Sequence, residues 1–203
     1  MKGKRHMLSD NQARPSLRIV SGDISEVSDE PELAPEVEAL DLVTEAITQA
    51  CGDKALLLIE RQPWGHTRPI PLVVIVPSGV YLIDPLLFPK SKIKANSDGL
   101  DLVVDGVLKP RFARKMSDNC DALVAALETG PVPEANMTAL YCLVKHRFVF
   151  SPLSVDGVDV VTLRGLIRLL KRKGDLDESA MERVHLDLAR RLDRAHPTQK
   201  SGS

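Results

Sequence analysis

The apolar positions of the chain change their spacing along the sequence, from a helical period to short continuous runs. Between residues 35 and 52, apolar side chains recur at helical spacing from Val37 to Cys51. Pro35 suits a first helical turn and Gly52 a helix end, so the pattern predicts one helix here. Three apolar runs of strand length follow, at 55–60, 70–76 and 80–84. The last two are joined by a short turn and are apolar throughout, which predicts a hairpin inside a sheet covered on both faces.

The remainder of the chain continues the alternation of strands and helices. Further strands are predicted at 91–95, 100–106, 138–145 and 155–163, and a helix is predicted at 109–128. Thr162 is suited to cap a helix at 164–174, and Asp177 to cap a last helix that ends before Pro197. This order predicts an α/β fold with a mixed central sheet, helices on both faces and a C-terminal helical pair.

Length and composition fit one domain with polar ends. The chain has 203 residues, of which 43% are hydrophobic, enough for a core that needs no disulfide or metal. Residues 1–33 are predicted to be a polar leader, disordered or ordered by a partner, followed by a domain at 34–195 and a flexible tail at 196–203. Three scattered cysteines argue against a zinc site. Without a signal-like start or an apolar run of about 20 residues, we expect a cytoplasmic protein that does not enter membranes.

The charge balance limits the classes of partner. A net charge of −1, from 27 basic and 28 acidic residues, argues against a protein that coats nucleic acid without specificity. Two local groups of basic residues nevertheless stand out, and each is either solvated surface or a face for a phosphate backbone. The first, a candidate nucleic-acid-binding group, consists of Lys109, Arg111, Arg114 and Lys115. The second consists of Arg164, Arg168, Lys171, Arg172 and Lys173.

Several segments together carry a family resemblance. They are LVVIVPSGVYLID at 72–84, then SDGLDLVVDG, SDNCDALVAAL, LYCLVKHRFVFSPLSVDGV and LRGLIRLLKRKGDLDESAMERV. In this order the chain resembles the nuclease-related domain (NERD) family of the restriction-endonuclease-like, PD-(D/E)xK fold, over roughly residues 35–195. The resemblance implies a mixed central sheet flanked by helices. It also implies a bacterial origin and a Mg²⁺-dependent, nuclease-like domain.

Phosphodiester hydrolysis explains the residue types in the family pattern. A hard cation held by carboxylate oxygens neutralises the phosphoryl oxygens and activates water. The pattern has one acid in the first strand of the hairpin and a Glu on the first helix. A second acid ends the second strand, and a Lys follows it two residues later on the same side. Asp84 matches the second acid, and Glu36 matches the helix Glu, with Glu38 as a second choice.

Other positions depart from this pattern. Pro71 occupies the position of the first acid of the pattern, and Leu72 occupies that of a His which usually follows it. Leu86 occupies the position of the Lys. Asn119 occupies the position of a Gln that the pattern often has in the later helix. An active site without one carboxylate and without the lysine has little means to stabilise the charge of the reaction. We therefore expect a degenerate nuclease-like domain, with no catalytic residue and no metal cofactor, that binds a protein partner or a nucleic acid.

The alternative is an active Mg²⁺-dependent DNA endonuclease whose catalytic lysine has moved to the next strand. Glu36 and Asp84 would then hold the metal ion, with Lys92 as the catalytic lysine. Lys90 and Lys94 are further choices for that lysine. Exposed lysines that protect an edge strand from aggregation explain the same pattern without catalysis.

Overall fold

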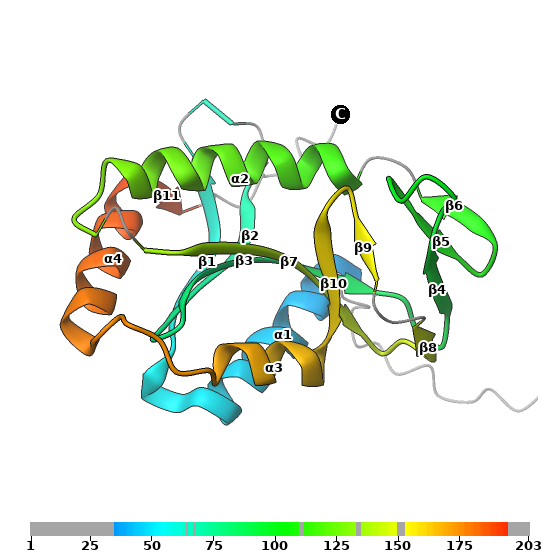
Figure 1. Cartoon of the computed structure of the whole chain (residues 1–203), viewed down its shortest axis with the longest axis horizontal. Helices are drawn as coiled ribbons and strands as arrows, with labels where there is room; N and C mark the ends of the chain where they lie inside the picture. Colours follow the sequence, from blue (N-terminus) through cyan, green and yellow to red (C-terminus); the bar gives the residue numbers. More distant parts are fainter. Residues whose placement is uncertain are drawn as a thin grey trace, which may run out of the picture. The chain divides into compact units, whose positions relative to one another are not determined.

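A computed structural model describes residues 35–63, 65–66, 68–109, 112–132, 135–149 and 153–194 (Figure 1). The predicted leader at 1–33 and the predicted tail at 196–203 lie outside the described residues. The helices are α1 (Pro35–Cys51), the 3₁₀ turn η1 (Gly52–Lys54), α2 (Phe112–Glu128), α3 (Leu163–Leu170) and α4 (Glu178–Arg191). None of the helices in this part of the chain is long and apolar enough to cross a membrane.

The strands form two sheets. The larger sheet has the order β11-β1-β2-β3-β7-β10-β9 and contains β1 (Leu56–Pro63), β2 (Ile70–Val76), β3 (Gly79–Leu87), β7 (Met137–Val144), β9 (Ser154–Val155), β10 (Val158–Thr162) and β11 (Leu192–Arg194). The smaller sheet has the order β6-β5-β4-β8 and contains β4 (Lys92–Ala95), β5 (Leu102–Val104), β6 (Val107–Lys109) and β8 (Phe148–Val149).

The larger sheet is mixed. Strands β1, β2 and β3 pair antiparallel, with Val74 of β2 opposite Tyr81 of β3, whereas β7 pairs parallel to both β3 and β10. Gly79 starts β3 after the turn at Pro77 and Ser78, and its positive φ of 136° is one that residues with a side chain rarely adopt. A Cβ at this glycine would lie 2.6 Å from the carbonyl oxygen of Asn136, so the position also requires the absence of a side chain.

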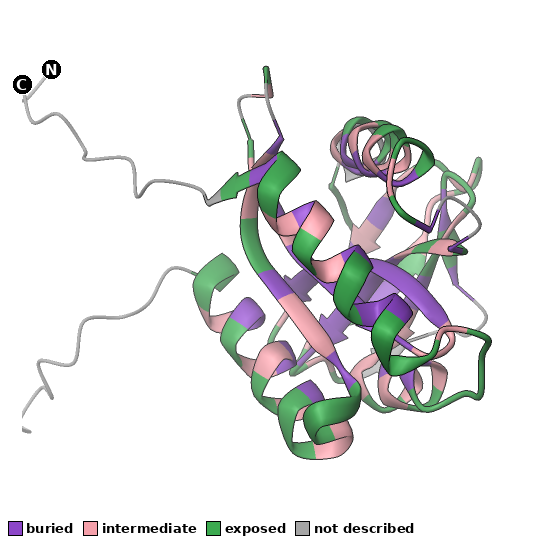
Figure 2. Cartoon of the chain, turned by 90° about the vertical axis from the view of Figure 1, so that its left-hand side faces the viewer, coloured by how far each residue is buried: buried purple, intermediate pink, exposed green. Residues whose placement is uncertain are grey.

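The β2–β3 hairpin is apolar because both of its faces are covered. Val73 and Ile75 belong to a core cluster that includes side chains of α2 and α4. Val74 and Ile83 belong to a second cluster, with side chains of α1 and α3. Figure 2 shows the buried residues concentrated on the strands and on the sides of the helices that face them. The predicted α/β class, with a mixed central sheet flanked by helices, is confirmed.

The two C-terminal helices begin where the sequence predicts. The hydroxyl of Thr162 accepts a hydrogen bond from the backbone N–H of Gly165 (3.2 Å), and the carboxylate of Asp177 accepts one from Ala180 (2.7 Å). The helices lie on opposite faces of the sheet, since Leu166 of α3 is in one core cluster and Ala180 of α4 in the other, so the predicted C-terminal helical pair is not confirmed.

Several predicted boundaries differ from the structure. The sequence predicts a last helix that ends only shortly before Pro197, but α4 ends at Arg191, and β11 then pairs with β1 at the edge of the sheet. Leu192 is 2% exposed, so pairing with the edge buries this side chain. Lys109, predicted in a helix, instead ends β6, and α2 begins at Phe112.

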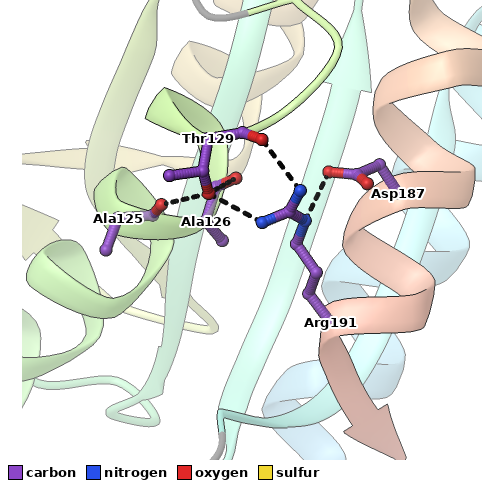
Figure 3. A network of polar contacts seen from close by, with 5 residues as sticks. All are labelled: Ala125, Ala126, Thr129, Asp187 and Arg191. Carbon is purple, nitrogen blue, oxygen red and sulfur yellow. Dashed lines mark hydrogen bonds and ion pairs between the residues drawn. The ribbon is translucent and has the colours of Figure 1, made fainter.

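Arg191 joins the last turn of α4 to the end of α2 (Figure 3). Its guanidinium donates to the hydroxyl and the carbonyl oxygen of Thr129, at 2.7 and 2.8 Å, and pairs with Asp187 at 2.7 Å. The carbonyl of Thr129 follows the C-terminus of α2, where carbonyl groups lack partners within the helix. One planar side chain therefore satisfies three acceptors on two elements.

Replacing Arg191 by lysine should lower the free energy of unfolding by about 0.5–1.5 kcal/mol, because a single ammonium cannot reproduce the fork of the guanidinium. Urea denaturation measures the change. Arg190→Lys, at the neighbouring exposed position, is the matched control. Equal losses in both variants would contradict the role of the contacts to Thr129.

Candidate functional site

A cleft of about 520 Å³ opens where β2 begins and β3 approaches its end. We call it the Asp84 cleft. It is lined by Glu36, Val37, Leu40, Glu60, Arg68, Pro69, Pro71, Asp84, Pro85 and Lys115. In the antiparallel register Leu72 pairs with Ile83, and Pro71 and Asp84 are the residues directly beyond this pair on the two strands. The cleft thus receives side chains from the first turn of α1, from the hairpin and from α2.

Asp84 is the buried charge of this cleft. Both carboxylate oxygens lie close to the ammonium of Lys115, with Nζ at 3.2 Å from Oδ1 and 3.1 Å from Oδ2. The Asp84 side chain is 6% exposed and that of Lys115 is 27% exposed. Alternation along β3 places Asp84 on the face that α2 covers, so a lysine of α2 reaches it. We refer to this contact as the Asp84–Lys115 pair.

Burial dominates the electrostatics of the pair. Loss of solvent raises the pKa of the Asp84 carboxyl above its ordinary value, and the charge and hydrogen bond of Lys115 offset this only in part. The charge of Glu36 raises the same pKa further. Tyr141 lies opposite Asp84 on β7, and its pKa is raised by burial and by the negative charge of Asp84. Each of these shifts reflects the cost of a negative charge at this point of the sheet.

The structure brings together two of the three residues expected for an active site. Glu36 and Asp84 both line the cleft. Lys92 does not: it starts β4 in the smaller sheet, where its backbone N–H donates to the carboxylate of Asp105 at 2.8 Å. Lys90 and Lys94 are also outside the lining.

Positions matched to the family pattern also have defined places. Glu38, the second choice for the helix acid, forms an ion pair with Lys145 instead of lining the cleft. Leu86, at the position of the family lysine, is 7% exposed in the same core cluster as α2. Leu72 and Asn119 are buried as well, at 0% and 3% exposure. Packing in the core therefore accounts for Leu72 and Leu86.

Sequence reasoning missed the role of Lys115. The charge pattern groups this lysine with Lys109, Arg111 and Arg114 as a basic face for nucleic acid, but its ammonium contacts Asp84 inside the cleft. Lys109 is exposed at the end of β6, whereas Arg111 and the side chain of Arg114 lie outside the described residues. The available signal was Asp84 itself, because a carboxylate within a buried strand requires a positive partner.

Glu60 is the second residue that the sequence did not single out. It lies in β1 with a φ of +48°, in the left-handed region, which costs a residue with a Cβ about 1–2 kcal/mol. The ladder pairs Ile59 with Leu72 and Arg61 with Ile70 on either side of it. The sequence signal for Glu60 is that an acidic residue directly follows the apolar residues 55–59. In the fold this exposed carboxylate lies at the cleft, near the start of β2.

The residues of the cleft do not fit a Mg²⁺ ion. Mg²⁺ needs oxygen ligands in octahedral geometry, yet no group of three or more His, Cys, Asp or Glu side chains within the described ranges is placed to hold a metal. Pro71 offers no ligand at the position of the first family acid, and Lys115 already contacts both oxygens of Asp84. A cation of the protein itself thus stands beside the buried carboxylate.

Comparisons with protein-family models, with curated proteins and with solved structures gave no match. The contacts, burial and charges of the cleft therefore carry the functional assignment of this chain.

Asp84→Asn should become more stable relative to the native chain as the pH rises from about 4 to 7. A raised pKa means that the folded state holds the Asp84 proton more tightly than the unfolded state does. The stability contributed by that proton is complete below the unfolded pKa and is lost as the pH rises through the folded pKa. The asparagine variant lacks this dependence.

Urea denaturation across this pH range measures the difference, whose slope cannot exceed about 1.4 kcal/mol per pH unit for one proton. The exposed Asp175→Asn is the control. A difference between Asp84→Asn and the native chain that stays constant, or that runs the other way, would show that burial does not dominate at Asp84.

Lys115→Met should lower the free energy of unfolding at pH 7 by about 1–3 kcal/mol, because it leaves the buried carboxylate of Asp84 without its cation. The loss should shrink near pH 4, where the carboxyl takes up a proton. Lys109→Met, at an exposed position, should change stability by less than about 0.5 kcal/mol. Combining Lys115→Met with Asp84→Asn should recover part of the loss, and strictly additive effects would argue against a direct interaction.

Proposed function

We propose that this chain is a catalytically degenerate, nuclease-related domain of the restriction-endonuclease-like fold, and that it acts by binding a protein partner at the Asp84 cleft. The observation that carries the proposal is the Asp84–Lys115 pair, in which a side chain of the protein neutralises the carboxylate that the family uses for a metal ion. The hairpin, the preceding helix α1 and the mixed sheet between helices support the fold assignment.

The chemistry of the cleft argues against hydrolysis. A nuclease must supply charge stabilisation and an activated water at one point. Here Pro71 and Leu86 occupy the positions of the family acid and lysine, and Leu86 is packed in the core. Asp84 is nearly buried, and both of its carboxylate oxygens already lie close to the ammonium of Lys115, which would have to give way to a bound cation.

The charges that remain favour protein over nucleic acid. Once Asp84 and Lys115 neutralise each other, the lining keeps two carboxylates, Glu36 and Glu60, and one cation, Arg68. This balance repels a phosphate backbone. The apolar part of the lining includes Val37, which is 41% exposed. A partner segment that brings a lysine or arginine to the carboxylates and an apolar side chain to Val37 matches both features.

Two competing functions predict different behaviour. An active endonuclease would use Glu36 and Asp84 with a lysine, and among the described residues Lys115 is the lysine that lines the cleft. A nucleic-acid-binding domain would use Lys109 with its basic neighbours, and its affinity would fall steeply with salt because phosphate contacts release counterions. Binding of a protein at the Asp84 cleft would survive moderate salt.

We expect the full chain in Mg²⁺ or Mn²⁺ to nick supercoiled plasmid no more than the Asp84→Ala variant does. We also expect no electrophoretic mobility shift of duplex DNA at low salt. The reason is that Lys115 already contacts both oxygens of Asp84 and that the lining of the cleft keeps more carboxylates than cations. Cleavage by the native chain that Asp84→Ala abolishes would overturn the proposal in favour of the endonuclease. A shift of DNA that salt removes would favour nucleic-acid binding.

The protein partner is tested in cells with a photoreactive amino acid at Val37. We expect one discrete crosslinked protein, retained in moderate salt and reduced when Glu60→Lys is added. The same photoreactive residue at Glu182, exposed on α4, is the control. Identical crosslinks from both positions, or none from Val37, would contradict binding at the cleft.

A further inference from the structure

A second surface, formed by α1 and α3, differs from the Asp84 cleft in charge. It is an open groove of about 790 Å³ lined by Ala46, Leu163, Arg164, Ile167, Arg168 and Lys171. We call it the basic groove. Figure 1 shows α1 and α3 next to each other on the same side of the sheet, and the two helices share one core cluster.

Helical spacing explains the composition of the groove. Leu166 and Leu170 are 0% and 2% exposed and fix α3 against α1 and the sheet. Arg164 and Arg168 are four residues apart on α3, and Lys171, the residue at the C-terminal end of this helix, follows three residues later, so the three cations lie on one side of α3 and its end. Leu163 and Ile167 form a parallel, partly buried row, which Ala46 of α1 extends.

The positive charge of the groove is available for a ligand. In the described part of the chain, the ion pairs join Lys115 to Asp84, Lys145 to Glu38 and Arg191 to Asp187, and none uses a cation of the groove. Arg164, Arg168 and Lys171 are all exposed. The exposed Arg172 and Lys173 follow directly and add to the local positive potential.

We infer that the basic groove binds an acidic amphipathic segment of a partner protein, with carboxylates on Arg164, Arg168 and Lys171 and apolar side chains on Leu163 and Ile167. A row of cations beside a row of apolar residues is complementary to a helix that carries Glu and Leu at spacings of three and four. This binding does not depend on the function proposed for the Asp84 cleft.

A nucleic acid matches the groove less well. A phosphate backbone uses the cations but gains nothing from the apolar row of Leu163 and Ile167. Stacking of unpaired bases needs aromatic side chains, and the lining of the groove contains none. The combined charge and apolar surface therefore selects a polypeptide.

The probe is a fluorescent designed peptide with Leu and Glu at positions i and i+4, measured by anisotropy with the full chain. One comparison peptide has Gln in place of Glu, and another has Ser in place of Leu. We expect the Glu/Leu peptide to bind at least about tenfold more tightly than either, since both the charges and the apolar side chains contribute. A duplex DNA of matched length is the polyanion control.

Two double variants locate the site. Arg164→Glu with Arg168→Glu should weaken binding of the Glu/Leu peptide by about tenfold or more, whereas Arg183→Glu with Arg190→Glu on α4 makes the same change in net charge and should alter it less than about twofold. If the charge reversal affects folding, Arg164→Gln with Arg168→Gln removes the two positive charges without reversing them and should weaken binding in the same direction. Equal effects of both reversals, equal binding of the Ser peptide, or tighter binding of the DNA would overturn the inference.

Discussion

The carboxylate of Asp84 has to be accommodated inside a strand whose neighbours are apolar on both faces. Burial of an unpaired charge is costly, and the ammonium of Lys115 reduces that cost by contacting both oxygens. The contact requires β3 to present Asp84 toward α2, and α2 to start close enough for its early residues to reach the strand. The positions of the hairpin and of α2 are therefore linked through one ion pair, and that pair defines the chemistry of the cleft.

The same contact makes the proposed degeneracy of the nuclease motif compatible with a stable fold. Removing a metal site leaves behind any carboxylate that held the ion, and that charge needs either solvent or a new partner. Leu86 fills the position of the family lysine with a core side chain, and Lys115 supplies the positive charge from a different element. Stability and the proposed loss of catalysis thus depend on the same two residues, Leu86 in β3 and Lys115 in α2.

The sequence predicted those features that depend on local pattern. The helix at 35–51, the buried hairpin and the caps at Thr162 and Asp177 are all set by spacing and by residues near in sequence. The contact of Lys115 with Asp84 spans 31 residues and depends on how α2 packs on the sheet, which no local pattern encodes. The positive φ of Glu60 and the addition of β11 to the sheet edge are likewise outcomes of tertiary packing.

The cleft and the basic groove both use α1, yet the ligands proposed for them differ in charge. Ten residues separate Glu36 from Ala46, which corresponds to about 15 Å along a helix. Over this distance the lining changes from an excess of carboxylates to an excess of cations. Because a single ligand charge cannot satisfy both surfaces, binding at one does not imply binding at the other. The carboxylates around the first turn of α1 and the cations of α3 would instead give each surface its own specificity, as expected where electrostatic complementarity discriminates among partners.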